Sequence, residues 1–271
     1  MNILEKIVAH KRKEVAEKKA LYPVALLEKS IYFKTPTVSL TKYLQRPDKS
    51  GIIAEFKRKS PSKGDINPYA EVEKVSIGYM QAGASALSIL TDEHFFGGHN
   101  KDLIVARKFN FCPILRKDFT IDEYQIIEAR SIGADCILLI AECLEKDQLK
   151  QLAKTAKNLG LEVLLEIHSA DQLDKLNEFV DIVGVNNRNL TDFTVNIGAS
   201  LELSTQIPTG VLKISESGLD DPNAVVKLRR AGFQGFLIGE HFMNSADPAA
   251  ACGEFIHRVQ HITQILDKAI A

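Results

Sequence analysis

The sequence predicts an α/β protein, a (β/α)8 barrel of the TIM-barrel type with an N-terminal helical extension. Eight short apolar runs after residue 51 alternate with longer segments of helical periodicity. The runs recur about every 26 residues, which is roughly the length of a strand, a loop and a three-turn helix. They are continuous in Ile, Val and Leu, as strands buried on both faces are. A length of 271 residues suits one such barrel.

The predicted strands are the apolar runs at residues 52–54, 86–90, 113–115, 136–140, 162–165, 182–185, 211–214 and 235–238. Helical patterns occupy residues 71–82, 121–132, 145–159 and 224–231. Gly133 and Gly160 follow two of these patterns, as helix-ending glycines do, and Pro222 opens another helix. An open doubly wound sheet is the alternative, but the first turn carries no G-x-G-x-x-G motif, which favours the barrel.

Residues 1–50 form a predicted N-terminal extension, and residues 51–271 form the barrel, within a single domain overall. Residues 1–20 are amphipathic, with apolar side chains near one face at Leu4, Ile7, Val8 and Val15. The basic residues at 11–13 and 18–19 are expected on the solvated face of this helix.

Composition excludes several classes of protein. Lys and Arg number 34 against 35 Asp and Glu, so no basic excess points to nucleic acid. No apolar run approaches the roughly 18 residues of a membrane span, and the N-terminus lacks the apolar core of a signal peptide. The four cysteines form no C-x-x-C pair and are expected to be reduced thiols. We therefore expect a cytoplasmic protein whose partner is a small molecule. We expect it to be a monomer rather than an oligomer.

The candidate site lies at the carboxyl ends of the strands, where barrels place their active sites. Glu55 and Glu166 are each flanked by apolar residues, and an ionised carboxylate in such a run is costly unless it is paired. Lys57 and Lys117 end strands on the same rim and are plausible partners. Two carboxylates and two lysines in one barrel mouth can perform general acid and base catalysis. Burial and mutual charge can move their pKa values towards neutrality.

Gly218 and Gly239 follow the last two predicted strands, where barrels often hold a phosphate on backbone N–H groups and a short helix N-terminus.

For several other residues of chemically reactive types, the sequence favours a structural role over a functional one. His94 and His99 lack a third ligand at metal-binding spacing, so no metal is predicted. His168 is expected to be an exposed loop residue, and Cys136 a core residue. Serines at 215 and 217 lack the G-x-S-x-G elbow of an acyl-transfer nucleophile.

Seven segments in order resemble the indole-3-glycerol phosphate synthase family, and the resemblance extends over essentially the whole chain. They are residues 53–62 (IAEFKRKSPS), 88–92 (SILTD), 115–119 (LRKDF), 165–168 (LEIH), 185–190 (VNNRNL), 215–218 (SESG) and 237–240 (LIGE). The resemblance implies ring closure of 1-(2-carboxyphenylamino)-1-deoxyribulose 5-phosphate, with loss of carbon dioxide and water, in tryptophan biosynthesis. It implies neither a metal nor an organic cofactor. It also implies that the extension at residues 1–50 lies over the barrel mouth.

The resemblance also implies residue roles. Lys117 matches the general acid at the ketose oxygen, Glu166 the general base, Lys57 a second substrate-contacting lysine, and Glu55 the carboxylate that orients the lysines. The remaining matches concern substrate binding, and they are Asn186 and Glu216 for sugar hydroxyls, Arg188 for positive potential, Ser60 for the anthranilate end, and Ser217, Gly218, Gly239 and Glu240 for the phosphate. Some relatives have Ser at position 240, so we expect the Glu240 side chain to turn away from the phosphate.

The residues by themselves indicate only a phosphate-binding barrel with acid and base groups. Phosphoribosylanthranilate isomerase and the histidine-pathway barrels satisfy that description, although the isomerase would favour a Cys/Asp pair rather than Glu55 and Lys57. A Schiff-base aldolase using Lys117 or Lys57, and a non-enzymatic scaffold, are further alternatives. The loop at residues 57–68 is rich in Lys, Ser, Gly and Pro, and we expect it to close over bound substrate.

Overall fold

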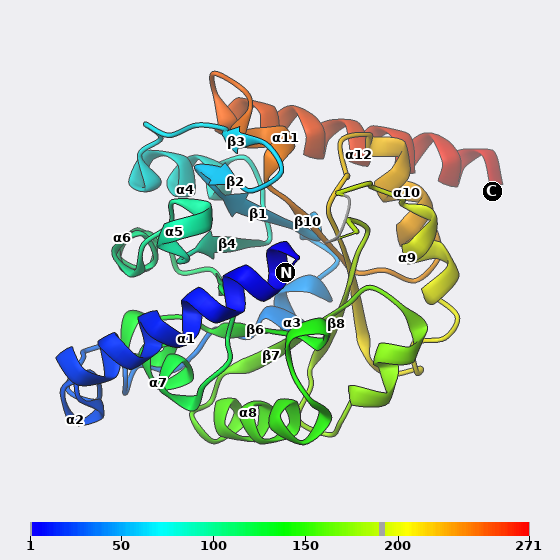
Figure 1. Ribbon diagram of the computed structural model, residues 1–271. Coiled ribbons are helices and arrows are strands. Elements are labelled where there is room, and N and C mark those ends of the chain that lie inside the picture. The colour runs from blue at the N-terminus through cyan, green and yellow to red at the C-terminus, as the bar shows by residue number, and fades with distance from the viewer. Residues whose placement is uncertain (1, 190–192, 271) are drawn as a thin grey trace.

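The computed structural model describes residues 2–189 and 193–270, so Leu190 of one family-like segment and Ala271 lie outside the described part. Eight parallel strands close into a barrel in the order β1-β10-β9-β8-β7-β6-β5-β4 (Figure 1). Their bounds are β1 Ile52–Phe56, β4 Ala86–Leu90, β5 Ile114–Lys117, β6 Cys136–Ile140, β7 Glu162–Ile167, β8 Ile182–Asn186, β9 Leu212–Glu216 and β10 Gly235–Ile238. The predicted barrel is confirmed.

Several strands continue past the apolar runs that predicted them. Five strands end at a polar residue or one position after it. These polar residues are Glu55, Lys117, Glu166, Asn186 and Glu216. Register pairs such as Asn186 with Glu216 show that ladder hydrogen bonding continues to these positions. A strand is defined by its backbone hydrogen bonds, so an apolar run underestimates its length where the side chains turn polar.

The helices at the predicted places are α4 Val72–Gln81, α7 Glu123–Ile132, α8 Lys146–Asn158 and α10 Pro222–Arg230. Further helices are α5 Glu93–Phe96, α6 Asn100–Phe109, α9 Gly198–Leu203, α11 Glu240–Met243 and α12 Pro248–Ile270. A short 3-10 helix η1 (Ala141–Cys143) follows β6, and a longer one, η2 (Ala170–Lys175), follows β7. The loop after β1 contains an unpredicted two-stranded hairpin of β2 (Lys59–Ser60) and β3 (Gly64–Asp65). No helix within residues 2–189 and 193–270 is long and apolar enough to cross a membrane.

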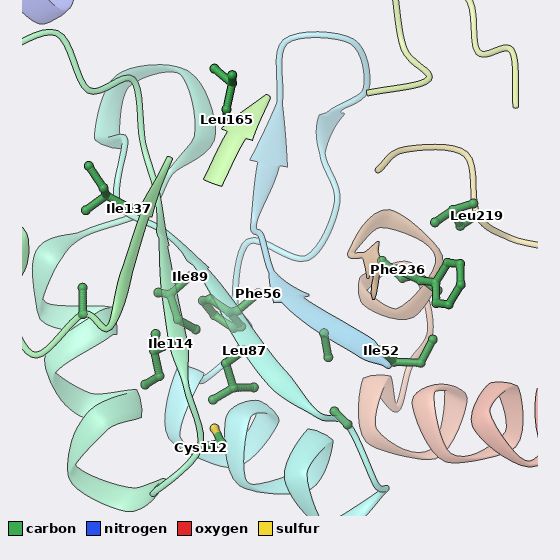
Figure 2. Packing of buried hydrophobic residues seen from close by; sticks show 14 of the residues in the cluster. Ile52, Phe56, Leu87, Ile89, Cys112, Ile114, Ile137, Leu165, Leu219 and Phe236 are labelled. Carbon is green, nitrogen blue, oxygen red and sulfur yellow. The ribbon is translucent and has the colours of Figure 1, made fainter. Parts of the chain in front are cut away.

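Side chains alternate along each strand between the barrel interior and the surrounding helices. Ile53, Leu164 and Ile214 belong to the interior cluster. Phe56 and Ile89 belong to the larger cluster between strands and helices, part of which Figure 2 shows from close by. This period of two fixes which residues at the strand ends face the barrel axis.

The N-terminal segment contributes to both ends of the barrel. Helix α1 (Ile3–Leu21) crosses the front of the barrel in Figure 1, with its first turn near the centre, and α2 (Val24–Leu27) follows it. Helix α3 (Leu40–Leu44) lies at the opposite end, where Leu40 and Leu44 join the interior cluster. There Glu162, the first residue of β7, accepts hydrogen bonds from Ser39 Oγ and from the Thr41 backbone and hydroxyl. Residues 1–50 are thus shared between the mouth and the base of the barrel.

The expectation that the basic residues of α1 are all solvated is wrong for Lys11. Lys11 is fully buried together with Leu4, Ile7 and Val15, because all four positions lie on one helix face. Lys18 is half-buried and lies 2.7 Å from Glu14. Arg12, Lys13 and Lys19 are exposed, as predicted.

Candidate active site

Side-chain alternation brings the predicted catalytic residues into one cavity at the barrel mouth. Each of the four charged residues lies two positions after an interior residue of its own strand, so its side chain faces the barrel axis; they are Glu55, Lys117, Glu166 and Glu216. All four line the same cavity with Lys57, Asn186, Arg188, Ser60, Ser217 and Glu240. Four of the five strand-end residues are charged, and they share one enclosed volume because the barrel closes around them.

Lys117 is the centre of this arrangement. Its Nζ lies 2.7 Å from Glu166 Oε2 and 2.9 Å from Glu216 Oε2. Burial alone would lower the pKa of Lys117, but the carboxylates of Glu166, Glu216 and Glu55 raise it above its ordinary value. The amine is therefore held as an ammonium group with two carboxylates in direct contact.

The two carboxylates beside Lys117 differ in their protonation. Burial would raise the pKa of Glu166, but the charge of Lys117, the neighbouring His168 and hydrogen bonds from Lys117 and Asn186 lower it to about 2. Burial raises the pKa of Glu216 to about 7, against the attraction of Lys117 and with the repulsion of Glu166. Environments that separate the pKa values of two carboxyl groups are typical of acid and base sites.

Glu216 packs against Gly184, a residue that sequence reasoning missed. A Cβ at Gly184 would lie 2.3 Å from Glu216 Oε1, so any larger residue would displace this carboxylate from its present position. Glu216 Oε1 is buried and has no hydrogen-bond partner among the described residues. The interior-facing position of Gly184 on β8 is the signal that could have found it.

Glu55 is held on the opposite side of the mouth. Ser88, an interior-facing residue of β4, donates a hydrogen bond of 3.1 Å to Glu55 Oε2, and Lys57 Nζ lies 3.3 Å from Oε1. A Cβ on Gly239 would approach Glu55 Oε1 to 2.7 Å, which accounts for glycine at that position. Ser88 lies in a family-like segment, but the sequence predicts no role for it.

Glu166 has two further neighbours. Asn186 Nδ2 donates a hydrogen bond of 3.0 Å to Glu166 Oε1, and His168 Nε2 lies 3.7 Å from the same oxygen. The prediction that His168 is an exposed loop residue is wrong, because its side chain is only 13% exposed. It lies two residues after Glu166 and points to the same side of the chain. Neither of its ring nitrogens has a hydrogen-bond partner within the part of the chain that the structure describes.

An apolar wall covers one side of the cavity. Ile3, Leu4 and Ile7 of α1 line it together with Phe96 and Phe119, whose ring centroids lie 5.9 Å apart. This wall suits the flat face of an aromatic ring. Sequence reasoning placed the helix over the mouth without naming these residues, although their spacing on the apolar face could have indicated them.

An adjoining cavity lies at the carboxyl ends of β9 and β10. Its lining includes Lys57, Arg188, Ser217, Gly218 and Gly239. Ser217 and Gly218 have positive φ angles of 68° and 69°, and Ser217 is one of two such non-glycine residues among those described. Left-handed backbone at a non-glycine residue is strained and is concentrated at functional sites.

Glu240 lies between the cations of this region. Its carboxylate is 3.1 Å from Arg188 Nη2 and 3.4 Å from Lys63 Nζ. The expectation that this side chain avoids a bound phosphate stays a prediction.

Ser60 is buried in the β2–β3 hairpin, and its hydroxyl lies 3.3 Å from the Ser62 hydroxyl.

The sequence predicts structural roles, with no part in chemistry, for Cys136, His94 and His99. Cys136 is fully buried in the barrel interior, as predicted. His94 stacks on His10 with ring centroids 4.3 Å apart, and His99 Nδ1 lies 3.4 Å from Glu93. Within residues 2–189 and 193–270, no three His, Cys, Asp or Glu side chains gather as a metal site requires.

Comparison with known proteins agrees with this geometry. The family model described as indole-3-glycerol phosphate synthase matches residues 4–255. A relative of that name from Bacteroides thetaiotaomicron is 48% identical over 259 residues, covering 96% of this chain and 99% of its own. Relatives of the same name from Magnetococcus marinus (40% identical; 95% and 99% covered) and Campylobacter jejuni (39%; 92% and 98%) are also similar along nearly their whole lengths. The chain therefore belongs to the indole-3-glycerol phosphate synthase family.

Proposed function

We propose that this chain closes the indole ring of indole-3-glycerol phosphate from 1-(2-carboxyphenylamino)-1-deoxyribulose 5-phosphate, with loss of carbon dioxide and water. The family assignment supports the reaction. One observation carries the assignment of roles. The Lys117 ammonium group contacts both Glu166 and Glu216 in a cavity that has an apolar wall on one side. This reaction needs an acid, a base, an aromatic surface and an anion site within one enclosed volume.

Lys117 is the proposed general acid. When the aryl carbon attacks the ketose carbonyl, the developing alkoxide takes a proton from Lys117 Nζ as the carbon–carbon bond forms. The carboxylate then leaves as carbon dioxide and returns its bonding electrons to the ring. The raised pKa keeps Lys117 protonated before the reaction, which an acid requires. A protonated lysine is a poor nucleophile, so the same observation disfavours a Schiff-base aldolase.

Glu166 is the proposed general base. The hydroxyl formed at the former carbonyl carbon must leave as water, and a proton must be removed from the intermediate for the ring to become aromatic. The lowered pKa keeps Glu166 ionised at neutral pH, and Asn186 fixes one of its oxygens. Lys57, paired with Glu55, is the second lysine that contacts the substrate, and it supplies the proton with which the hydroxyl leaves as water.

The substrate spans the mouth from the apolar wall to the adjoining cavity. Its anthranilate ring packs on the side lined by α1 and Phe96, with Ser60 near its carboxylate. Its phosphate binds the backbone N–H groups near Ser217, Gly218, Gly239 and Glu240, with positive potential from Arg188 and Lys57. Glu216 and Asn186 hold the sugar hydroxyl groups between these ends. The loop at 57–68, which carries the β2–β3 hairpin, closes over the bound substrate.

Turnover of the pure protein tests the proposal. We expect indole fluorescence to appear when the substrate is added in the presence of EDTA, and to be lost in both Lys117→Ala and Glu166→Gln. A well-folded wild type that gives no signal would contradict the proposed reaction. Borohydride trapping with a ketose phosphate would then test the aldolase alternative.

We also propose that the protein acts in the cytoplasm as a monomer and binds no nucleic acid. Its free cysteines and balanced charge support this proposal. Light scattering of the pure protein at micromolar concentration tests the oligomeric state, and a dimer mass would overturn that part.

A further inference from the structure

Lys11 of α1 is fully buried and is surrounded by three carboxylates. Its Nζ lies 2.8 Å from Asp92 Oδ2, 3.0 Å from Asp118 Oδ1 and 2.8 Å from Glu14 Oε2. Asp92 and Asp118 are themselves buried. A buried ammonium group is tolerated only where pairing and hydrogen bonds replace its hydration, and here three anions do so.

The two aspartates connect Lys11 to the catalytic rim. Asp118 follows Lys117 directly, at the end of β5. Its other contacts are hydrogen bonds from Thr91 Oγ1 and the Phe119 backbone, and an ion pair with Arg116. Lys11 is therefore attached to the residue that follows the proposed general acid.

Asp92 connects Lys11 to the apolar wall. Its Oδ1 accepts hydrogen bonds from the backbone N–H groups of Phe95 and Phe96 and so caps the start of α5. Phe96 is one of the wall residues, and Phe119, next to Asp118, is another. The ion cluster thus lies behind both aromatic residues of the wall.

Helix geometry relates Lys11 to the other half of the wall. Ile7 lies one turn before Lys11 and Leu4 about two turns before it, on the same buried face. Both line the cavity. A helix fixed at Lys11 therefore has its first two turns directed over the cavity.

We propose that Lys11 is a positioning residue for the reaction, which fixes α1 to the ends of β4 and β5 so that Ile3, Leu4 and Ile7 form the aromatic-binding side of the cavity. The inference rests on the proposed function, since it assigns a purpose to the wall. It concerns binding, because the wall contacts the ring in both the substrate and the transition state. Loss of such uniform binding raises KM more than it lowers kcat.

Lys11→Met tests this inference, with Lys13→Met as the matched control, since Lys13 is exposed on the same helix. We expect Lys11→Met to raise KM for the substrate at least tenfold and to change kcat by less than threefold. Lys11→Arg should recover most of the affinity, because guanidinium also pairs with two carboxylates. Lys13→Met should leave both constants unchanged. An unchanged KM in Lys11→Met would overturn the proposal.

Hydrogen exchange provides a readout that does not need turnover. Amides at residues 3–15 should exchange faster in Lys11→Met while those of the barrel strands keep their protection. Unchanged exchange in α1 would overturn the proposal even if the chain proved inactive on this substrate, so the two failures are distinguishable. If Lys11→Met does not fold, Asp92→Asn replaces it, because asparagine still caps α5 but removes one charge facing Lys11.

Discussion

Lys117 Nζ lies 2.9 Å from Glu216 Oε2, while the second oxygen of that carboxylate packs against Gly184 and accepts no hydrogen bond from any described residue. Only one of the two carboxylate oxygens of Glu216 therefore has a polar partner among the described residues of this charged site. The arrangement explains why the pKa of Glu216 is raised to about 7, since burial opposes its ionisation and Glu166 already neutralises part of the Lys117 charge.

The first prediction concerns stability against pH in Glu216→Gln. The folded state holds the Glu216 proton up to about pH 7, whereas an unfolded glutamate loses it near 4.5, so this contribution is present at low pH and is lost as pH rises through 7. Gln cannot ionise and avoids that loss. We expect Tm of Glu216→Gln relative to wild type to increase between pH 5 and pH 8, by several degrees.

Glu166 does not disturb this measurement. Its pKa is lowered to about 2, so the stability it contributes is lost only as pH falls below about 4.5, outside the chosen window. Glu202→Gln is the control, because Glu202 is exposed on α9. A pH-independent difference between Glu216→Gln and wild type would show that Glu216 is ionised throughout.

The second prediction concerns Gly184→Ala. The added Cβ would lie 2.3 Å from Glu216 Oε1 and 3.1 Å from Leu164 Cδ1, so the carboxylate must leave the position in which it contacts Lys117. We expect kcat/KM to fall at least tenfold, which corresponds to about 1.4 kcal/mol, while the far-ultraviolet circular dichroism stays that of the wild type. Gly160→Ala is a matched control for adding a methyl group far from the site, since its Cβ meets no atom within 4 Å, although its φ of 75° costs some stability. Full activity in Gly184→Ala would mean that the position of Glu216 is unimportant.

The third prediction concerns Glu240→Gln. This carboxylate neutralises Arg188 and Lys63 beside the proposed phosphate site. Its removal leaves both cations for the phosphate, so we expect KM for substrate and the inhibition constant for inorganic phosphate each to fall severalfold. The effect should weaken as ionic strength rises, because exposed charges are screened by salt. Weaker phosphate binding in the variant would show instead that Glu240 positions Arg188 for the ligand.

The fourth prediction separates the base of the barrel from its mouth. Leu40 of α3 is fully buried in the interior cluster, so Leu40→Ala should lower the free energy of unfolding by roughly 2–5 kcal/mol. We expect kcat and KM at 25 °C to be unchanged, since Leu40 lies at the base of the barrel and does not line the cavity that contains Lys117. Urea unfolding followed by circular dichroism measures the first quantity. Leu26→Ala, at a side chain 52% exposed, should change neither stability nor activity.

The chain by itself determined the architecture and most of the site. Eight continuous apolar runs at regular spacing were enough to predict the barrel, because strands buried on both faces have to be apolar over most of their length. Glu55 and Glu166 were identifiable because a carboxylate flanked by apolar residues requires a partner. The family-like segments then added Asn186, Arg188 and Glu216, whose roles no single local pattern indicates.

Only the tertiary structure decided which charges meet and which residues leave room for them. Lys11 and Lys13 are both basic residues of one amphipathic helix, yet Lys11 is fully buried against carboxylates that follow β4 and β5, and Lys13 is exposed. Nothing in the local sequence distinguishes Gly184. Its role becomes visible only in the fold, where Glu216, 32 positions later, packs against it. Local sequence sets the alternation and periodicity of each element, but long-range packing chooses its neighbours. The pairing of buried charges depends on those neighbours, and so does the pKa of each catalytic group.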